Sequence, residues 1–263
     1  MKDNLIKSEL IDKVLHLTLN DPLNQNALSE KMIKELDLKL QAASKNNDVK
    51  VVVISSTGKI FCAGHNLKEL KSKRLELDKG KNYYKELFKS CSNMMINIVQ
   101  NSKPIIAAVD GIATAAGCQL IASCDLAYSS DQAKFATPGV NIGLFCSTPM
   151  VALSRNVNKK QAMEMLLTGD LIDAKKAYKI GLINNYFSSD ELMKNVFEKA
   201  EKISSKSSKT IKIGKEAYYK QRAMSLEDAY NYTSSVMVEN MLENDSKEGI
   251  DAFLEKRKPI WNN

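Results

Sequence analysis

Two short apolar segments limit the possible folds of this chain more than any other feature of its sequence. Val51 to Ile54 form a continuous β-branched run, and Ile105 to Val109 form a second apolar run directly after Pro104. A strand with one face in water alternates apolar and polar residues, whereas a continuous run predicts a strand covered on both faces. Such strands are typical of parallel sheets that are flanked by helices.

Helical patterns separate these predicted strands. Ser29 is a predicted N-cap, because apolar residues recur at helical spacing after it. These residues are Met32, Ile33, Leu36, Leu40 and Ala43. A strand over Val14 to Leu19 precedes this helix, further helices are predicted within Lys81 to Val99 and over Ala116 to Ser123, and a strand follows at Leu126 to Ser129. The alternation of strand and helix predicts an α/β core.

The chain is predicted to become helical from Lys159 onward. The expected helices are Ala162 to Leu167, Ala174 to Lys179, a segment around Glu191 to Lys202, and two more up to Phe253. The basic run from Lys199 to Arg222 is interpreted as a solvated helix face. We place an approximate boundary between residues 1–200 and 201–263 but expect one functional unit.

The composition favours a single unit with small-molecule ligands. The 263 residues are 44% hydrophobic, enough for a sizeable core. The net charge of +7 comes mostly from scattered lysines, which suit a phosphate-bearing ligand but form no arginine-rich stripe. The five cysteines form no CxxC pair, and no apolar run reaches about 18 residues. We therefore expect a cytoplasmic protein with no membrane span and do not predict nucleic-acid binding.

Two loops of small residues follow the buried strands. They cover Phe61 to Asn66 and Gly111 to Gly117. Ligands of α/β proteins bind beyond the carboxyl ends of the strands, and N–H groups at a helix start hold negative charge. Neither loop fits GxxxxGK[ST] or GxGxxG, there is no GxSxG turn, and two histidines provide no metal cluster. We therefore expect no metal.

Many ordered motifs give the chain a clear family resemblance. They include Asn26–Leu28, Phe61–Leu70, Lys103–Ile105, Gly111–Asp125, Thr168–Gly169, Gly181–Ile183 and the ending Glu248–Pro259. With these motifs the chain resembles the enoyl-CoA hydratase/isomerase (crotonase) superfamily. The resemblance implies an α/β spiral of ββα units with a helical C-terminal region that forms a homotrimer, often a dimer of trimers. It also implies an acyl-CoA ligand, a role in acyl-CoA or fatty-acid metabolism, and no other cofactor.

The resemblance also assigns residues to a site. It implies that the backbone N–H groups of His65 and Ala116 bind the thioester oxygen as it becomes an enolate. A donor pair of this kind stabilises charge that develops in the transition state. The adenine contact falls on the backbone of Ala63, Lys68 lies near the CoA phosphates, and Lys256 reaches across from another subunit.

The sequence departs from the family pattern where the two catalytic glutamates are expected. The motifs place Gln119 at the first position and Gly139 at the second. An amide has no useful pKa and glycine has no side chain, so both changes argue against efficient hydration of an enoyl-CoA. Of the other polar residues, Glu69 is expected to face solvent or pair with a lysine, and Asp125 to cap a turn or satisfy buried N–H groups.

Three functions stay open at this point. The first is an enzyme that stabilises a thioester enolate with its N–H pair. The second is an acyl-CoA decarboxylase. Gly64-His65 resembles the same motif of methylmalonyl-CoA decarboxylase, and loss of CO₂ needs little help from an acid or a base. The catalytic tyrosine of that enzyme, however, corresponds to Cys146 in this chain. The third is a non-catalytic regulatory protein that binds acyl-CoA.

Overall fold

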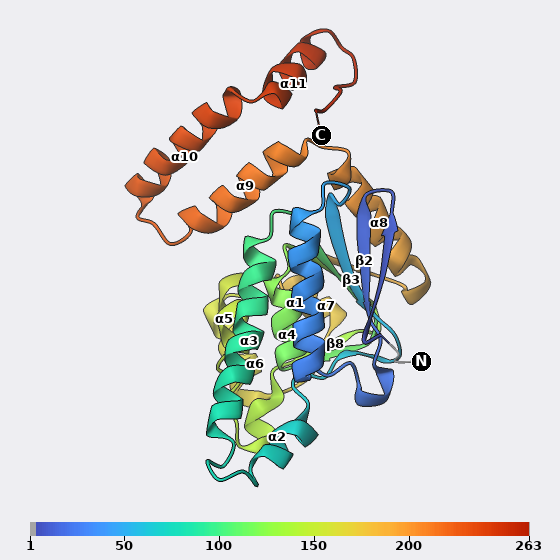
Figure 1. Ribbon diagram of the computed structural model, residues 1–263, viewed down its shortest axis with the longest axis vertical. Coiled ribbons are helices and arrows are strands. Elements are labelled where there is room, and N and C mark those ends of the chain that lie inside the picture. The colour runs from blue at the N-terminus through green and yellow to red at the C-terminus, as the bar shows by residue number, and fades with distance from the viewer. Residues whose placement is uncertain (1–3, 263) are drawn as a thin grey trace.

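The computed structural model describes residues 4–262 and shows a core of two sheets that carries a helical arm (Figure 1). The strands are β1 (Ile6–Ile11), β2 (Val14–Leu19), β3 (Val51–Ser56), β4 (Ile60–Cys62), β5 (Ile105–Val109), β6 (Ile112–Thr114), β7 (Leu126–Ser130), β8 (Lys134–Ala136), β9 (Ile172–Asp173) and β10 (Asn185–Phe187). The helices of the core are α1 (Glu30–Lys45), α2 (Leu67–Lys73), α3 (Lys81–Gln100), α4 (Ala116–Ser123), α5 (Pro149–Asn156), α6 (Lys159–Thr168), α7 (Ala174–Lys179) and α8 (Ser189–Ser204).

Successive pairs of strands are divided between the two sheets. The larger sheet has the order β1-β2-β3-β5-β7-β10, and the smaller sheet has the order β4-β6-β8-β9. Strands β2, β3, β5, β7 and β10 pair in parallel, while β1 pairs antiparallel to β2. Because β3–β4 and β5–β6 each give one strand to either sheet before a helix follows, the chain winds as ββα units. The predicted α/β spiral is confirmed.

The central strands are covered on both faces, as their continuous apolar runs predict. Val52 and Ile54 of β3 pack into the large core cluster that contains the buried residues of α1 and α3. Val51 and Val53 point to the opposite face, where they join Val196 of α8 in a second cluster. Because successive side chains of a strand point to opposite faces, one apolar run packs against helices on both sides of the sheet.

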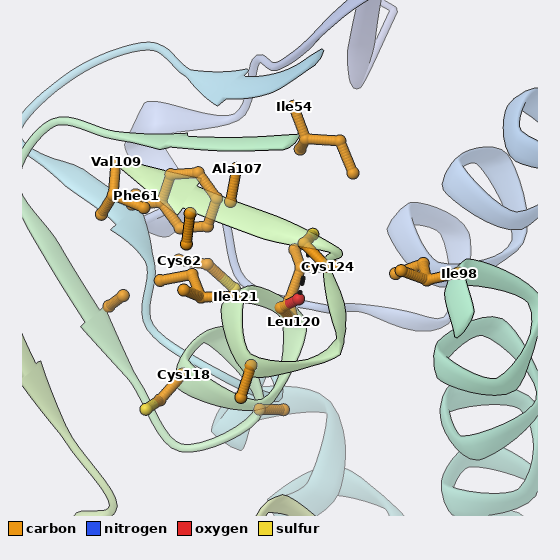
Figure 2. Packing of buried hydrophobic residues seen from close by; sticks show 14 of the residues in the cluster. Ile54, Phe61, Cys62, Ile98, Ala107, Val109, Cys118, Leu120, Ile121 and Cys124 are labelled. Carbon is orange, nitrogen blue, oxygen red and sulfur yellow. Dashed lines mark hydrogen bonds between the residues drawn. The ribbon is translucent and has the colours of Figure 1, made fainter. Parts of the chain in front are cut away.

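Helix α4 is buried along its whole length. All eight of its residues are shielded from solvent. Figure 2 shows Leu120 and Ile121 of α4 among buried residues of the neighbouring strands, including Phe61, Cys62 and Ala107. This packing fixes the position of the helix start and of the turn before it, where the candidate site lies.

Three helices form the C-terminal arm, whereas two were predicted. They are α9 (Ser208–Gln221), α10 (Leu226–Met241) and α11 (Asn244–Leu254), and α10 and α11 project beyond the core (Figure 1). The Ser225 hydroxyl caps α10, and a short turn after Met241 separates α10 from α11. The interpretation of Lys199 to Arg222 as a solvated face is wrong at Lys215, whose side chain is only 8% exposed.

Replacing Ser29 with alanine is expected to lower the free energy of unfolding by about 1 kcal/mol. The Ser29 hydroxyl accepts a hydrogen bond from the Met32 N–H at 3.1 Å and so caps α1. Urea unfolding measures the loss. Ser188→Ala is the matched control, because Ser188 precedes α8 without capping an N–H group. An equal loss in both variants would contradict the assignment of the cap.

Candidate active site

Two turns that follow different strands meet at the start of α4. The first turn follows β4 and contains Gly64, and the second follows β6 and contains Ala115. The Thr114 hydroxyl donates to the carbonyl of Ala63 at 3.1 Å and joins the two turns. A Cβ added to Gly64 would lie 2.9 Å from the Ala115 Cβ and 3.2 Å from the Ala116 nitrogen. Only glycine allows this approach, and Gly64 also has a φ of +91°.

Ala115 has a backbone conformation that alanine rarely adopts. Its φ is +50° and its ψ is −118°. The neighbouring structure holds it there, because its N–H donates to the Ala136 carbonyl at 3.0 Å and its carbonyl accepts from the Gln119 N–H at 3.0 Å. Strain of this kind costs on the order of 1–3 kcal/mol and clusters at functional sites.

The strained turn leaves two N–H groups free. Among residues 4–262, neither the N–H of His65 nor that of Ala116 donates to a protein acceptor. Ala116 is the first residue of α4, so its N–H has no partner within the helix. The close approach of Gly64 to the Ala116 nitrogen brings the two donors to the same place. Such a pair suits an oxygen that gains negative charge.

The His65 side chain is fixed as a neutral ring. Its Nδ1 lies 3.2 Å from the carbonyl of Leu28, which only accepts, so Nδ1 carries the proton. Burial lowers the pKa of His65, and the ring edge packs against Phe88. Its Nε2 is buried without a partner among the described residues. The ring therefore presents a lone pair, not a donor.

We expect the folded protein to lose stability as the pH falls below about 6.5, partly because of His65. The unfolded chain takes up a proton there that the folded protein resists, at a cost of at most about 1.4 kcal/mol per pH unit. His65→Asn keeps a donor for Leu28 and removes this titration. Urea unfolding at about pH 7.5 and about pH 5.5 compares the two proteins. Equal losses would show that His65 does not contribute.

Two further buried polar atoms without partners belong to residues next to Ala115. Gln119, which is 4% exposed, bonds Ala115 through its main chain, yet its Oε1 has no partner. The Thr137 hydroxyl is likewise unpaired and directly follows Ala136. With His65, these are three of the six buried unpartnered side-chain atoms in the described chain. Buried polar groups are normally satisfied, so three unpartnered atoms on segments that meet at this turn indicate a place for a polar ligand or water.

Gly139, the position that the resemblance assigns to the second glutamate, has no space for a side chain. A Cβ on Gly139 would lie 2.7 Å from the Leu144 carbonyl oxygen and 2.9 Å from the Cys146 sulfur. Gly139 is buried, and the loop that follows it is packed around it. The structure therefore offers no carboxylate at this position and no room for one.

The other predicted ligand residues are on three separate segments. The Ala63 N–H donates to the Gln25 carbonyl at 3.2 Å. The Ala63 carbonyl accepts from the Thr114 hydroxyl, so it keeps one free lone pair for an adenine. Lys68 is exposed at the start of α2, and Lys256 is exposed just after α11 in the arm. The structure brings His65, Ala116 and Gln119 around one turn, and the assigned roles of all these residues stay predictions.

Two expectations for acidic residues have different outcomes. Asp125 satisfies the Ile105 N–H at 2.7 Å, as predicted, and also pairs with Lys215. Glu69 neither pairs with a lysine nor faces only solvent, because its carboxylate accepts from the Tyr83 hydroxyl and the Glu30 N–H.

No helix within residues 4–262 is long and apolar enough to cross a bilayer, and the same residues contain no cluster of three or more potential metal ligands.

Sequence reasoning missed Thr114, Thr137 and Leu28 as parts of this site. Leu28 is 37 residues from His65, and its contact has no local signal. Thr114 ends β6 and Thr137 directly follows β8, and both strands are only three residues long. The one available signal was their position beside small-residue turns, Thr114 before Ala115 and Thr137 before Gly139.

Comparisons with known proteins show which proteins this chain is similar to. Residues 9–263 match the model of a family described as Enoyl-CoA hydratase/isomerase. A human protein named enoyl-CoA hydratase domain-containing protein 3, mitochondrial, is 45% identical over 251 residues, which cover 95% of this chain and 81% of the relative. The likeness to that protein was predicted from Thr137 to Pro149 and is confirmed.

Solved structures extend the likeness to three dimensions. The crystal structure of human enoyl coenzyme A hydratase domain-containing protein 3 has a TM-score of 0.93 at 44% identity and covers 98% of this chain and 100% of its own. An enoyl-CoA hydratase from Mycobacterium smegmatis has a TM-score of 0.94 at 42% identity, with coverage of 99% and 100%.

Proposed function

Because this chain belongs to the enoyl-CoA hydratase/isomerase family, we propose that it binds an acyl-CoA and stabilises the thioester enolate with the N–H groups of His65 and Ala116. The observation that carries the proposal is the free donor pair beside the strained Ala115. Donors held in place before the reaction stabilise developing charge without reorganisation. The proposal requires no metal and no cofactor other than the coenzyme A of the ligand.

Hydration of an enoyl-CoA is not the reaction that these residues support. The Gln119 amide neither gives nor takes a proton at neutral pH, and Gly139 provides no group. The neutral His65 ring also offers no donor for a substrate carboxylate through Nε2, which weakens the decarboxylase alternative. Binding of acyl-CoA without turnover is the second candidate, and the packed surroundings of Gly139 favour it.

Replacing Gly139 with glutamate is expected to destabilise the protein by about 1–3 kcal/mol and not to create hydratase activity. The new side chain meets the Leu144 carbonyl and the Cys146 sulfur. Gly214→Glu is the matched control, since nothing lies within 4 Å of a Cβ at Gly214 in α9. Urea unfolding and a crotonyl-CoA hydration assay measure both effects. A stable G139E that hydrates crotonyl-CoA would contradict the prediction.

The experiment that tests the function separates binding from turnover. The purified protein is titrated calorimetrically with acetyl-CoA and crotonyl-CoA, and then incubated with crotonyl-, malonyl- and methylmalonyl-CoA while products are followed by mass spectrometry. Binding with turnover supports the enolate enzyme, and binding without turnover supports the regulatory candidate. No binding of any thioester would overturn both.

We also propose that the arm assembles three chains, as the resemblance to the crotonase superfamily implies. Large apolar side chains of α10 and α11 are exposed in the single chain, among them Leu226, Met237, Leu242, Phe253 and Leu254. Exposed apolar surface on this scale marks an interface. Trimerisation would place Lys256 near a neighbouring chain's ligand. Native mass spectrometry distinguishes one, three and six chains, and a monomer at micromolar concentration would contradict the proposal.

A reducing compartment completes the proposal. All five cysteines are free and buried in the described chain, which suits the cytoplasm that we expect. The human relative carries the word mitochondrial in its name. Imaging of a tagged protein would distinguish a cytoplasmic location from a mitochondrial one.

A further inference from the structure

A polar cavity of about 380 Å³ lies where the C-terminal arm meets the core. Its volume is in the range of roughly 300–1,000 Å³ that is usual for ligand pockets. The core contributes Ser44, Ser102 and Lys103, and α9 contributes Ser208, Lys209 and Lys212. Lys103 precedes β5, whereas the turn of the candidate active site lies beyond its other end. The five residues of β5 separate the two places by about 16 Å.

The side of the cavity formed by Lys103 and α9 presents hydrogen-bond donors. Within residues 4–262, the ammonium groups of Lys103 and Lys212 have no hydrogen-bond or ion-pair partner. The cavity also contains the start of the 14-residue α9, where the main-chain N–H groups of Ser208 and Lys209 remain free because the Ser207 hydroxyl caps only Thr210. The positive end of the helix dipole adds to the two ammonium charges.

The acidic residues of the cavity are already engaged. Glu243 pairs with Lys209 at 3.3 Å. Asp245 accepts from the Ser207 hydroxyl and from the Asn262 N–H. Within the described part of the chain neither carboxylate pairs with Lys103 or Lys212, so these two cations have no direct counter-charge there.

Like charges consequently oppose one another around Lys103. Burial lowers the pKa of Lys103, and the nearby charges of Lys212 and Lys50 lower it further. Lys50 is itself only 9% exposed. Cations that repel each other in a partly buried place gain free energy when an anion binds between them.

We propose that this cavity binds a small phosphate-bearing anion between Lys103 of the core and Lys212 and the N–H groups of α9. Phosphate oxygens are strong acceptors that match ammonium groups and a helix start. The bound anion joins the arm to the core, so it stabilises the position of the arm. The site uses none of the residues assigned to acyl-CoA binding, and its test is independent of that function.

The test compares inorganic phosphate with chloride at equal ionic strength on the full-length protein. Calorimetric titration and thermal unfolding are expected to show saturable phosphate binding and a higher midpoint temperature. Lys212→Met is expected to weaken phosphate binding about tenfold or more, because a charged hydrogen bond is lost. Lys202→Met is the matched control, since Lys202 is exposed on α8 outside the cavity. Lys103→Met is the second variant.

The ligand and the variants together decide the proposal. Adenosine 5′-monophosphate, titrated in parallel, shows whether the site prefers a phosphate monoester or free phosphate. If the protein binds either ligand and K212M does not, the site is supported. If K103M does not fold, the exposed Lys212 still tests it. Effects of phosphate that match those of chloride, or equal binding by K212M and K202M, would overturn it.

Discussion

Replacing Asp125 with alanine is expected to lower the free energy of unfolding by about 3–5 kcal/mol. The Asp125 carboxylate lies between the core and α9, where Lys215 donates to Oδ2 at 2.6 Å and the Tyr219 hydroxyl donates to Oδ1 at 3.0 Å. The Lys215 ammonium also donates to the carbonyls of Ile98 and Lys103. Without Asp125, a cation that is 8% exposed loses the one acidic partner that it has among residues 4–262.

The size of this effect follows from burial. Burial raises the pKa of Asp125 and lowers the pKa of Lys215, so each charge alone is unfavourable in this place. Their attraction and the shared hydrogen bonds offset that cost only while both are present. Asp125→Leu combined with Lys215→Met is therefore expected to lose less stability than D125A alone.

Urea unfolding of the variants measures the effect, and a surface pair provides the control. Glu191 pairs with Lys194 at 3.4 Å with side chains 49% and 65% exposed, so Glu191→Ala should cost about 0–1 kcal/mol. Similar losses in D125A and E191A would refute the argument. Since Lys215 and Tyr219 belong to the arm, native mass spectrometry of D125A would also test whether this contact supports the proposed trimer.

Long, regular segments of the fold were predictable from the sequence. The five apolar residues assigned to the helix after Ser29 are the five that α1 buries. The runs over β3 and β5 identified the covered strands because each is an unbroken apolar segment of the chain. The strands of the smaller sheet were not predicted, since β4, β6 and β8 have three residues each and provide too few positions for a period to appear.

Only those features of the site that depend on neighbouring residues in the sequence were predictable. Small residues indicated the two turns, but nothing in the sequence distinguishes Ala115, with a positive φ, from its neighbour Ala116. Lys215 was equally hidden, because one buried lysine within a lysine-rich helix has no sequence mark of its own. Both features arise from contacts between distant segments, with Ala136 and Asp125 respectively.

Replacing Ala116 with proline is expected to decrease thioester turnover about 10²–10³-fold, or about 3–4 kcal/mol of transition-state stabilisation. Proline lacks the N–H that we assign to the thioester oxygen. It is tolerated in the first position of a helix, and Ala116 holds that position in α4. Ala116→Gly keeps the N–H and is the matched control. Exchange of the α-proton of a bound acyl-CoA in D₂O, followed by mass spectrometry, reports enolate formation for any acyl group.

A second ligand separates the lost donor from a distorted turn. An S-alkyl coenzyme A ether has no carbonyl oxygen, so its affinity should be the same for the native protein and A116P, while the thioester loses affinity only in A116P. Equal weakening of ether and thioester would show that proline deforms the turn at Ala115, and the rate would then say nothing about the N–H. Unchanged exchange in a folded A116P would remove Ala116 from the donor pair and leave His65 as the remaining assigned donor.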